Sequence, residues 1–99
     1  MAKKTAKKES VYKKLGAFIK CSNMDGVANQ FVLMYAKGQV FQSYRSICAA
    51  RVGDQWYFDP HYHDYSTTTS KYVKRFSGLS TDQRRKMLAS GEAISVDFN

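Results

Sequence analysis

The sequence of 99 residues lacks several features that would assign the protein to a broad class at once. No apolar run approaches the roughly 18 residues that a membrane-spanning helix needs, so we expect no membrane span. The opening residues MAKKTAKKES have no apolar core after their lysines, and we expect no secretory signal. No internal repeat divides the chain, and its length suits one domain with one modest core.

Motifs of the common enzyme classes are also missing: there is no nucleophile elbow, no Walker loop and no GxGxxG fingerprint. His61, His63 and Asp64 form a short cluster that could contribute to a metal site. Ser66 follows them and could be read as a nucleophile. A metal site needs more ligands, and catalytic residues this close in sequence rarely converge in space. We therefore expect a protein that is not an enzyme, with no catalytic residues, no metal and no cofactor.

Cysteine is scarce, and the two cysteines form no CxxC motif. Cys48 lies in the small apolar run of residues 46–50 and is expected to be a buried free thiol. The two cysteines, Cys21 and Cys48, could in principle form one disulfide. Without a secretory signal, a reducing cytoplasm is the better interpretation.

Acidic residues are few, with eight against sixteen basic residues and a net charge of +8. Residues 1–20 hold +6 of this charge, and residues 21–99 are nearly balanced at +2. We expect residues 1–9 to be a flexible basic N-terminal arm and residues 10–99 to be a single α+β domain. A lysine arm favours polyanions through counterion release, in a salt-dependent way. The alternative is a solvated tail that keeps the protein in solution.

Hydrophobic periodicity predicts the first half of the domain. Apolar residues at helical spacing over 10–20 predict a helix that packs on the domain, although a lysine-rich helix for an anionic membrane has the same pattern. Residues 21–28 are expected to form a loop. Two β-favouring runs flank the turn at Lys37-Gly38, and strand character continues to Val52 before returning at residues 55–58. These runs predict a three-stranded antiparallel meander with a long central second strand.

Two short helices and a final strand are expected after Pro60. Ser66 or Thr67 can cap a helix that ends at Gly78. Ser80 and Gln83 match a capping box for a second helix, which ends at Gly91. Residues 93–98 then alternate as a strand at a sheet edge. The predicted fold is an α+β domain in which the meander and the C-terminal strand are packed by two or three short helices on one sheet face.

Two patterns occur together in this chain: FQSYxSxxA at residues 41–49 and DYSxTTxKY at residues 64–72. Together they resemble a family of small bacteriophage-encoded proteins of unknown function. The resemblance covers residues 29–76, about half of the chain, and excludes the lysine arm. It implies a phage origin and a host-cytoplasm setting, and it supplies no catalytic residues.

Four hydroxyl residues in a row begin the helix near residue 66. Hydroxyls and free N–H groups at a helix start can hold a phosphate, and Lys71 lies one turn further on. Helix capping alone is the competing explanation for part of this run. The candidate contacts for an anion or a partner are Ser66, Thr67, Thr68, Tyr62 and Tyr65.

The leading functional hypothesis is a non-enzymatic phage accessory protein that binds nucleic acid, or a host nucleic-acid complex, without sequence preference. The arm and the two C-terminal helices would supply the phosphate contacts. The candidate residues are Lys3, Lys4, Lys7, Lys8, Lys71, Lys74, Arg75, Arg84 and Arg85. Tyr62 and Tyr65 could stack on bases if exposed, whereas Trp56 and Tyr72 are expected in the core.

Two alternatives remain open at the level of sequence. The protein could be a host-takeover or anti-defence inhibitor that docks on a bacterial protein through the aromatic loop 57–65 or a free sheet edge. It could also be a small metal-dependent or phosphate-handling enzyme that uses His61, His63 and Asp64. No membrane partner is expected, and the oligomeric state is open.

Overall fold

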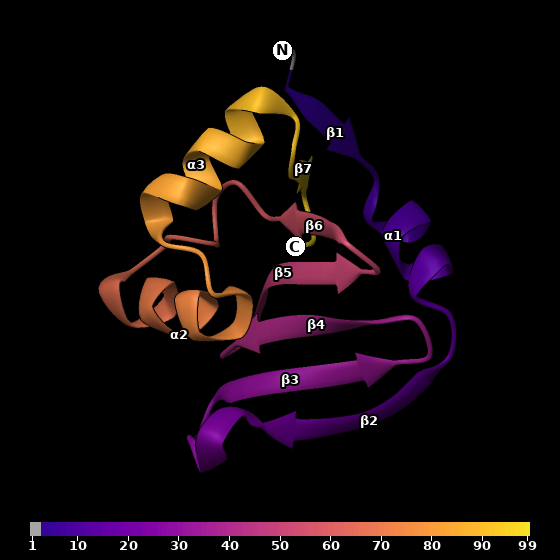
Figure 1. Cartoon of the computed structure of the whole chain (residues 1–99). Helices are drawn as coiled ribbons and strands as arrows, with labels where there is room; N and C mark the ends of the chain where they lie inside the picture. The colour runs from indigo at the N-terminus through magenta and orange to yellow at the C-terminus, as the bar shows by residue number, and fades with distance from the viewer. Residues whose placement is uncertain (1–2) are drawn as a thin grey trace.

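A mixed β-sheet of seven strands forms the middle layer of the computed structural model, which describes residues 3–99. The elements in chain order are β1 (Lys4–Ala6), α1 (Lys8–Leu15), β2 (Phe18–Asn23), a 3-10 turn (Met24–Gly26), β3 (Gln30–Tyr35), β4 (Gly38–Ser43), β5 (Ser46–Val52), β6 (Gln55–Phe58), α2 (Thr67–Ser77), α3 (Thr81–Ser90) and β7 (Ile94–Val96). The strand order is β1-β7-β6-β5-β4-β3-β2 (Figure 1). Strands β2 to β6 form an antiparallel meander, and β7 runs parallel to both β6 and β1.

The α+β class is confirmed, but the sheet is larger than the predicted meander with one added strand. The long second strand is two strands, β4 and β5, because the chain reverses at Tyr44-Arg45. Tyr44 has φ 56°, in the left-handed region that non-glycine residues seldom adopt. Its N–H donates to the Asn29 carbonyl at 2.6 Å. This turn contains no glycine, so the sequence pattern predicted one continuous strand across it.

The helix predicted over residues 10–20 is wrong in its second half. Helix α1 ends at Gly16, whose φ of 80° and N–H bond to the Tyr12 carbonyl close the last turn. The chain then continues as β2, an edge strand whose six residues are all exposed. Phe18 and Ile19, expected on the buried stripe of the helix, are 54% and 61% exposed. Residues 21–23 of the predicted loop 21–28 therefore belong to β2, and the 3-10 turn begins at Met24.

The predicted basic arm over residues 1–9 is largely part of the fold, although Met1 and Ala2 lie outside the described residues. Lys4–Ala6 pair with β7 as strand β1, and α1 begins at Lys8. Because β1 covers β7, the last strand is not at the sheet edge as expected. The pairing consists of backbone hydrogen bonds, so a lysine-rich segment can join it with its side chains in solvent.

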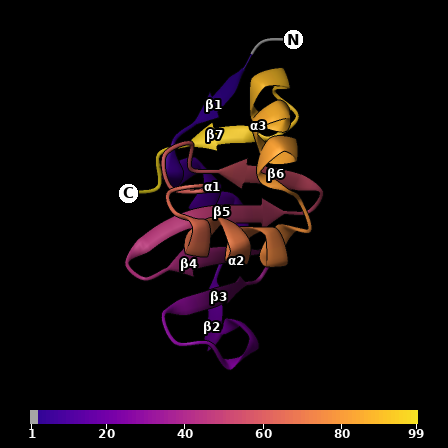
Figure 2. The same ribbon diagram turned by 90° about the vertical axis from the view of Figure 1, so that its left-hand side faces the viewer.

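Helices lie on both faces of the sheet, which corrects the expectation that they cover one face (Figures 1 and 2). On one face Val11 and Leu15 of α1 pack in one core cluster with Val40 and Ala50 of the sheet. On the other, α2 and α3 pack against a second cluster: Phe41, Cys48, Ala49, Phe58, Val73, Leu88 and Ala93. The protein is therefore a three-layer α/β/α arrangement with one sheet and two small cores.

The predicted helix boundaries of the second half are confirmed. The Ser66 Oγ accepts the Thr69 N–H at 3.1 Å, and Ser80 with Gln83 forms the expected capping box. Gly78 and Gly91 end the two helices in left-handed conformations. Cys48 is buried and free, as predicted, and burial raises the pKa of its thiol to about 12. Over residues 3–99 no helix is long and apolar enough to cross a membrane.

Candidate anion-binding site

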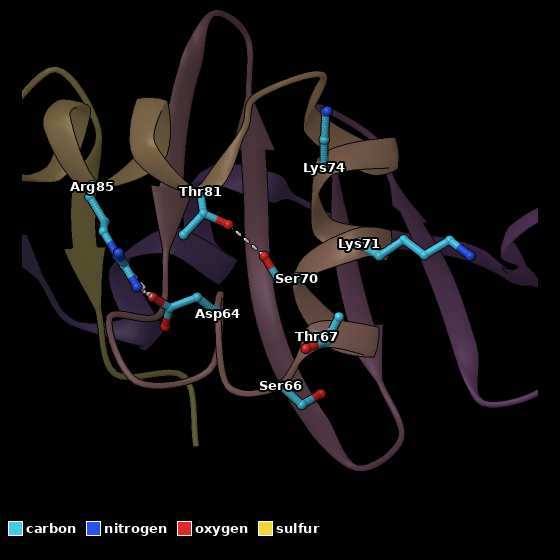
Figure 3. Close-up of a pocket in the computed structure, with 8 residues that line it drawn as sticks. All are labelled: Asp64, Ser66, Thr67, Ser70, Lys71, Lys74, Thr81 and Arg85. Carbon is cyan, nitrogen blue, oxygen red and sulfur yellow. Dashed lines mark hydrogen bonds and ion pairs between the residues drawn. The ribbon is translucent and has the colours of Figure 1, made fainter.

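A hollow of about 480 Å³ lies between α2, α3 and the loop that precedes α2 (Figure 3). Four hydroxyl residues, three cations and one carboxylate line it. The lining residues are Asp64, Ser66, Thr67, Ser70, Lys71, Lys74, Thr81 and Arg85. We refer to this hollow as the α2–α3 pocket. Helical periodicity brings the α2 members together, since residues 67, 70, 71 and 74 follow one face of a helix.

Ser70 and Thr81 join the two helices at the centre of the pocket. Their hydroxyl oxygens are 2.6 Å apart and share a hydrogen bond (Figure 3). Thr81 is the first residue of α3, and Ser66 and Thr67 stand at the start of α2. The first turns of both helices therefore reach the pocket. Each helix start carries backbone N–H groups without an intrahelical acceptor and a partial positive charge.

Arg84 lies behind the hydroxyl pair and is completely buried. Its Nη2 donates to Ser70 Oγ at 2.8 Å and to Thr81 Oγ1 at 3.2 Å. The same guanidinium donates to the carbonyls of Leu79 and His63 and to His63 Nδ1. All of these acceptors are uncharged, so the Arg84 cation is satisfied by hydrogen bonds and has no ion-pair partner among them. Burial lowers the pKa of the Arg84 guanidinium from its ordinary value.

His63 supports this buried arginine. The imidazole is 2% exposed, and its Nδ1 accepts the Arg84 Nε–H at 3.0 Å. An accepting Nδ1 requires the neutral ring with its proton on Nε2, which lies 4.0 Å from the Asp64 carboxylate. Burial lowers the pKa of His63, and this outweighs the opposing effect of Asp64. The neutral histidine is thus the form that fits the site.

Exposed cationic side chains sit around the rim of the pocket. The Arg85 guanidinium pairs with Asp64 at 2.7 Å, and that carboxylate is mostly buried. Lys71 and Lys74 are exposed and extend away from the hydroxyl pair in Figure 3. Lysine side chains have four flexible bonds, so both ammonium groups can swing over the opening. Three cations against one carboxylate leave the pocket positive, and buried Arg84 adds to its potential.

The structure gathers some of the predicted contact residues and separates others. Ser66, Thr67, Lys71, Lys74 and Arg85 line the α2–α3 pocket together. Thr68 is exposed and lies outside it.

Arg75 turns to the other side of α2 and pairs with Asp25 at 3.0 Å. Arg84 is wrong as a phosphate contact, because a side chain with no exposed surface cannot reach a ligand in solvent. The sequence predicted that Arg84 and Arg85 are both exposed on α3. Helical spacing alone does not show which of these two adjacent arginines faces the core.

The N-terminal lysines do not join the pocket. Lys3, Lys4, Lys7 and Lys8 are exposed, on and around β1 and the first turn of α1. Helix α1 lies across the sheet from α2 and α3 (Figure 1). The basic residues expected to form a single footprint therefore fall into two groups.

An aromatic cluster borders the pocket on the side of Asp64. The rings of Tyr62 and Tyr65 are 5.3 Å apart, and His61 packs edge-on against both. Tyr65 is 64% exposed, whereas Tyr62 is half-buried. His61 and His63 therefore point to different surroundings. Across residues 3–99, no group of three or more histidine, cysteine or acidic side chains could hold a metal ion.

Ser70, Thr81 and Asp64 are pocket residues that the sequence reasoning did not assign to an anion site. Ser70 could have been found from its spacing, because it lies three residues after Thr67 and four before Lys74. Thr81 could not, since its place depends on how α3 packs beside α2. The sequence associates Asp64 with the neighbouring histidines, yet its main partner in the structure is Arg85.

Comparison with known proteins places the chain in a family. No curated protein and no solved structure matches it. One family model matches residues 4–93, a span that includes most of the lysine-rich segment outside the earlier resemblance. The chain belongs to DUF8033, a family of unknown function.

Proposed function

We propose that this protein is a non-enzymatic nucleic-acid-binding protein whose α2–α3 pocket contacts phosphate groups. The observation that carries the proposal is that Lys71, Lys74 and Arg85 line the same pocket as the hydrogen-bonded Ser70–Thr81 pair. Cations and hydroxyl donors in one hollow suit phosphate oxygens. Nothing in this contact set reads a base edge, so binding is without sequence preference.

The distribution of charge supports the same function. The net charge of +8 attracts polyanions generally. Strands β1 and β7 and helix α3 share one end of the sheet in both views (Figures 1 and 2). Strand β1, which carries Lys4, therefore lies at the same end of the molecule as α3, although Lys4 does not line the pocket. A nucleic-acid strand running along α3 from the pocket would approach this end of the sheet.

The exposed tyrosine adds a contact for bases. Tyr65 lies between pocket residues Asp64 and Ser66 and presents its ring to solvent. A base next to a phosphate held in the pocket could stack on this ring, which favours single strands over duplexes. Tyr62 supports Tyr65 from behind and is the less accessible of the two.

The test is an electrophoretic shift with single-stranded and double-stranded probes at about 50 mM salt. We expect binding by the wild type and a loss of about tenfold or more in the charge-reversed variant Lys71→Glu/Lys74→Glu. Lys13→Glu/Lys14→Glu is the matched control, since these exposed lysines lie on α1 across the sheet. No shift with either probe at low salt would reject the function. Equal losses in both double variants would reject the site.

We further propose, from the sequence patterns at residues 41–49 and 64–72, that the protein is of bacteriophage origin and acts in the host cytoplasm. The family description gives neither a function nor a source, so the distribution of the family among genomes tests this origin. Occurrence of the DUF8033 pattern mainly in cellular genomes, away from prophage regions, would contradict it.

A second function is favoured by one observation, the bare edge of β2. All six of its residues are exposed, including the apolar Phe18 and Ile19. A free strand edge can add a strand from another protein. A phage inhibitor of a host protein would use this edge. Affinity capture from nuclease-treated bacterial lysate tests this function. The wild type and the pocket variant Lys71→Glu/Lys74→Glu should both capture a stoichiometric protein partner. The edge-strand variant Ile19→Lys should lose it.

A further inference from the structure

We infer that the α2–α3 pocket receives the terminal phosphate of a nucleic-acid strand, a phosphate monoester, in preference to a phosphodiester within the strand. This inference rests on the proposed nucleic-acid binding and names the part of the ligand that enters the pocket. Three features of the pocket carry it: its charge, its hydroxyl donors and its two helix starts.

The charge of the pocket matches a dianion. The lining holds three cations, Lys71, Lys74 and Arg85, and one carboxylate, that of Asp64, which leaves an excess of two positive charges. A terminal phosphate carries about 1.5 to 2 negative charges near pH 7, whereas each internal phosphodiester carries one. The buried Arg84 cation lies within hydrogen-bond distance of the pocket wall and strengthens the preference for the more highly charged group.

Counting hydrogens shows that the hydroxyl pair offers a donor. Arg84 has no acceptor atom, so Ser70 and Thr81 both accept from its Nη2, whose two hydrogens are shared among these hydroxyls and the His63 carbonyl. One of their two hydroxyl hydrogens forms the 2.6 Å bond between them. The hydrogen bonds found within residues 3–99 give the other hydroxyl hydrogen no acceptor. Because both side chains line the pocket, this hydrogen is available to an oxygen that enters it.

The buried arginine is what fixes this arrangement. Without Arg84, the Ser70 and Thr81 hydroxyl groups could rotate freely and would present acceptor lone pairs to the pocket as readily as donor hydrogens. Arg84 donates to both oxygens from the protein side and holds their hydrogens away from itself. Arg84 is therefore a positioning residue, and the pocket is a donor site at its centre as well as at its rim.

The two helix starts reach the pocket from different directions, and their serine caps already take the Thr69 and Gln83 N–H groups. Thr67 opens α2 and Thr81 opens α3, and both line the pocket. A terminal phosphate has three unesterified oxygens that can meet donors from α2, α3 and the rim together. An internal phosphodiester has two, and its strand must leave the pocket in both directions. The number and spread of donors thus favour the strand end.

The experiment compares two short single-stranded oligonucleotides of one sequence, fluorescently labelled at the 3′ end, one with a 5′-phosphate and one with a 5′-hydroxyl. Fluorescence anisotropy gives both dissociation constants for the full chain at about 50 mM salt. We expect the wild type to bind the 5′-phosphorylated strand about tenfold more tightly, as charge-assisted hydrogen bonds to an extra oxygen imply. Inorganic phosphate should compete for that preference.

The variants locate the preference in the pocket. Ser70→Ala and Lys71→Gln should reduce it to less than about threefold, while Lys13→Gln on α1 should keep it. Lys71 is exposed, so Lys71→Gln reports on the site even if Ser70→Ala unfolds the protein, which a urea midpoint would reveal.

The outcomes separate this inference from the proposed function. Equal affinity for the two strands overturns the terminal-phosphate inference and leaves nucleic-acid binding standing. No binding of either strand overturns both. Tighter binding of a phosphoserine peptide than of the 5′-phosphorylated strand also overturns it and assigns the pocket to a protein ligand. A preference that Lys71→Gln leaves intact overturns the location.

Discussion

Arg84 carries a positive charge into the space between α2, α3 and the loop before α2, where its hydrogen-bond partners are neutral. A buried cation is costly unless its donors are satisfied. Here the imidazole of His63, two carbonyls and two hydroxyls satisfy the guanidinium. This one residue therefore links the packing of α3 to the chemistry of the α2–α3 pocket. Arg85, its neighbour, is exposed and lines the pocket, whereas the sequence predicted an exposed position for both arginines.

Replacing Arg84 with leucine should lower the free energy of unfolding by about 3 kcal/mol, because several buried acceptors would lose their donor together. Arg85→Leu is the matched control, since that side chain is 61% exposed and should cost about 1 kcal/mol or less. Urea unfolding of the two variants measures the difference. Equal costs would mean that the Arg84 hydrogen bonds contribute little.

His63 gives the protein a pH-dependent stability with a defined sign. Burial lowers the pKa of folded His63 below the ordinary 6.5, so the unfolded chain binds more protons in the window between the two values. The stabilising contribution is complete above about pH 6.5 and is lost as the pH falls through the folded pKa. Protonation would also turn the acceptor for Arg84 into a donor.

The check is the pH dependence of urea unfolding from about pH 7.5 to about pH 5. The wild type should lose stability more steeply than His63→Asn, whose amide oxygen can accept from Arg84 but does not titrate in this range. Parallel curves for the two proteins would show that His63 does not carry the effect.

At the scale of elements, local signals predicted some parts of the fold well. The capping box at Ser80 and the glycines after both helices are short-range features, and they fixed the ends of α2 and α3. The edge strands could not be predicted this way. β2 has no buried residue to create an alternating pattern, and β1 pairs with a strand that lies about ninety residues later. Their formation depends on backbone pairing, which leaves little trace in side-chain type.

The candidate site follows the same division. Lys71 and Lys74 could be predicted on one helix face, and Ser66 could be predicted as a cap, because helix periodicity is local. The roles of Ser70 and Thr81 depend on the contact of two helices. The inward direction of Arg84 depends on His63, twenty-one residues earlier. Contacts of this kind require the tertiary structure.

A substitution at Gly38 tests the close packing of β4 against β5 and α1. A Cβ atom at this position would overlap the Arg51 carbonyl oxygen of β5 and approach Leu15 Cδ2 of α1 to 2.8 Å. Gly38→Ala should therefore reduce the free energy of unfolding by about 3 kcal/mol. Gly53→Asn is the control: its φ is 58°, which asparagine tolerates, and a Cβ there meets open space. A tolerated Gly38→Ala would contradict the tight β4–β5 register.

The N-terminal and C-terminal segments of the described chain pair with each other in the sheet, as strands β1 and β7. β1 lies at one edge of the sheet and β2 at the other, and α1 crosses between them on the face opposite α2 and α3 (Figure 1). Because β1 pairs with β7, the lysine-rich segment contributes to folding as well as to charge. Any loss of nucleic-acid binding on removing it would therefore mix two effects.

Removal of residues 1–6 should lower the melting temperature by about 5 °C, since β7 loses its outer partner and Ala6 leaves the α1 side of the core. Lys3→Ala/Lys4→Ala removes the charge and keeps the strand, so its melting temperature should stay near that of the wild type. If the truncated protein melts like the full chain, residues 4–6 behave as the solvated arm that the sequence alone suggested.

The central claim is that the phosphates of a nucleic acid are bound at the α2–α3 pocket. Its most direct test is the slope of log affinity against log salt concentration, because each neutralised phosphate contributes a slope of about −0.7 for a single strand. We predict that Lys71→Gln/Lys74→Gln makes the slope shallower by about 1.4 and that Lys13→Gln/Lys14→Gln leaves it unchanged. An unchanged slope in the pocket variant, or an equal change in both, would contradict the account.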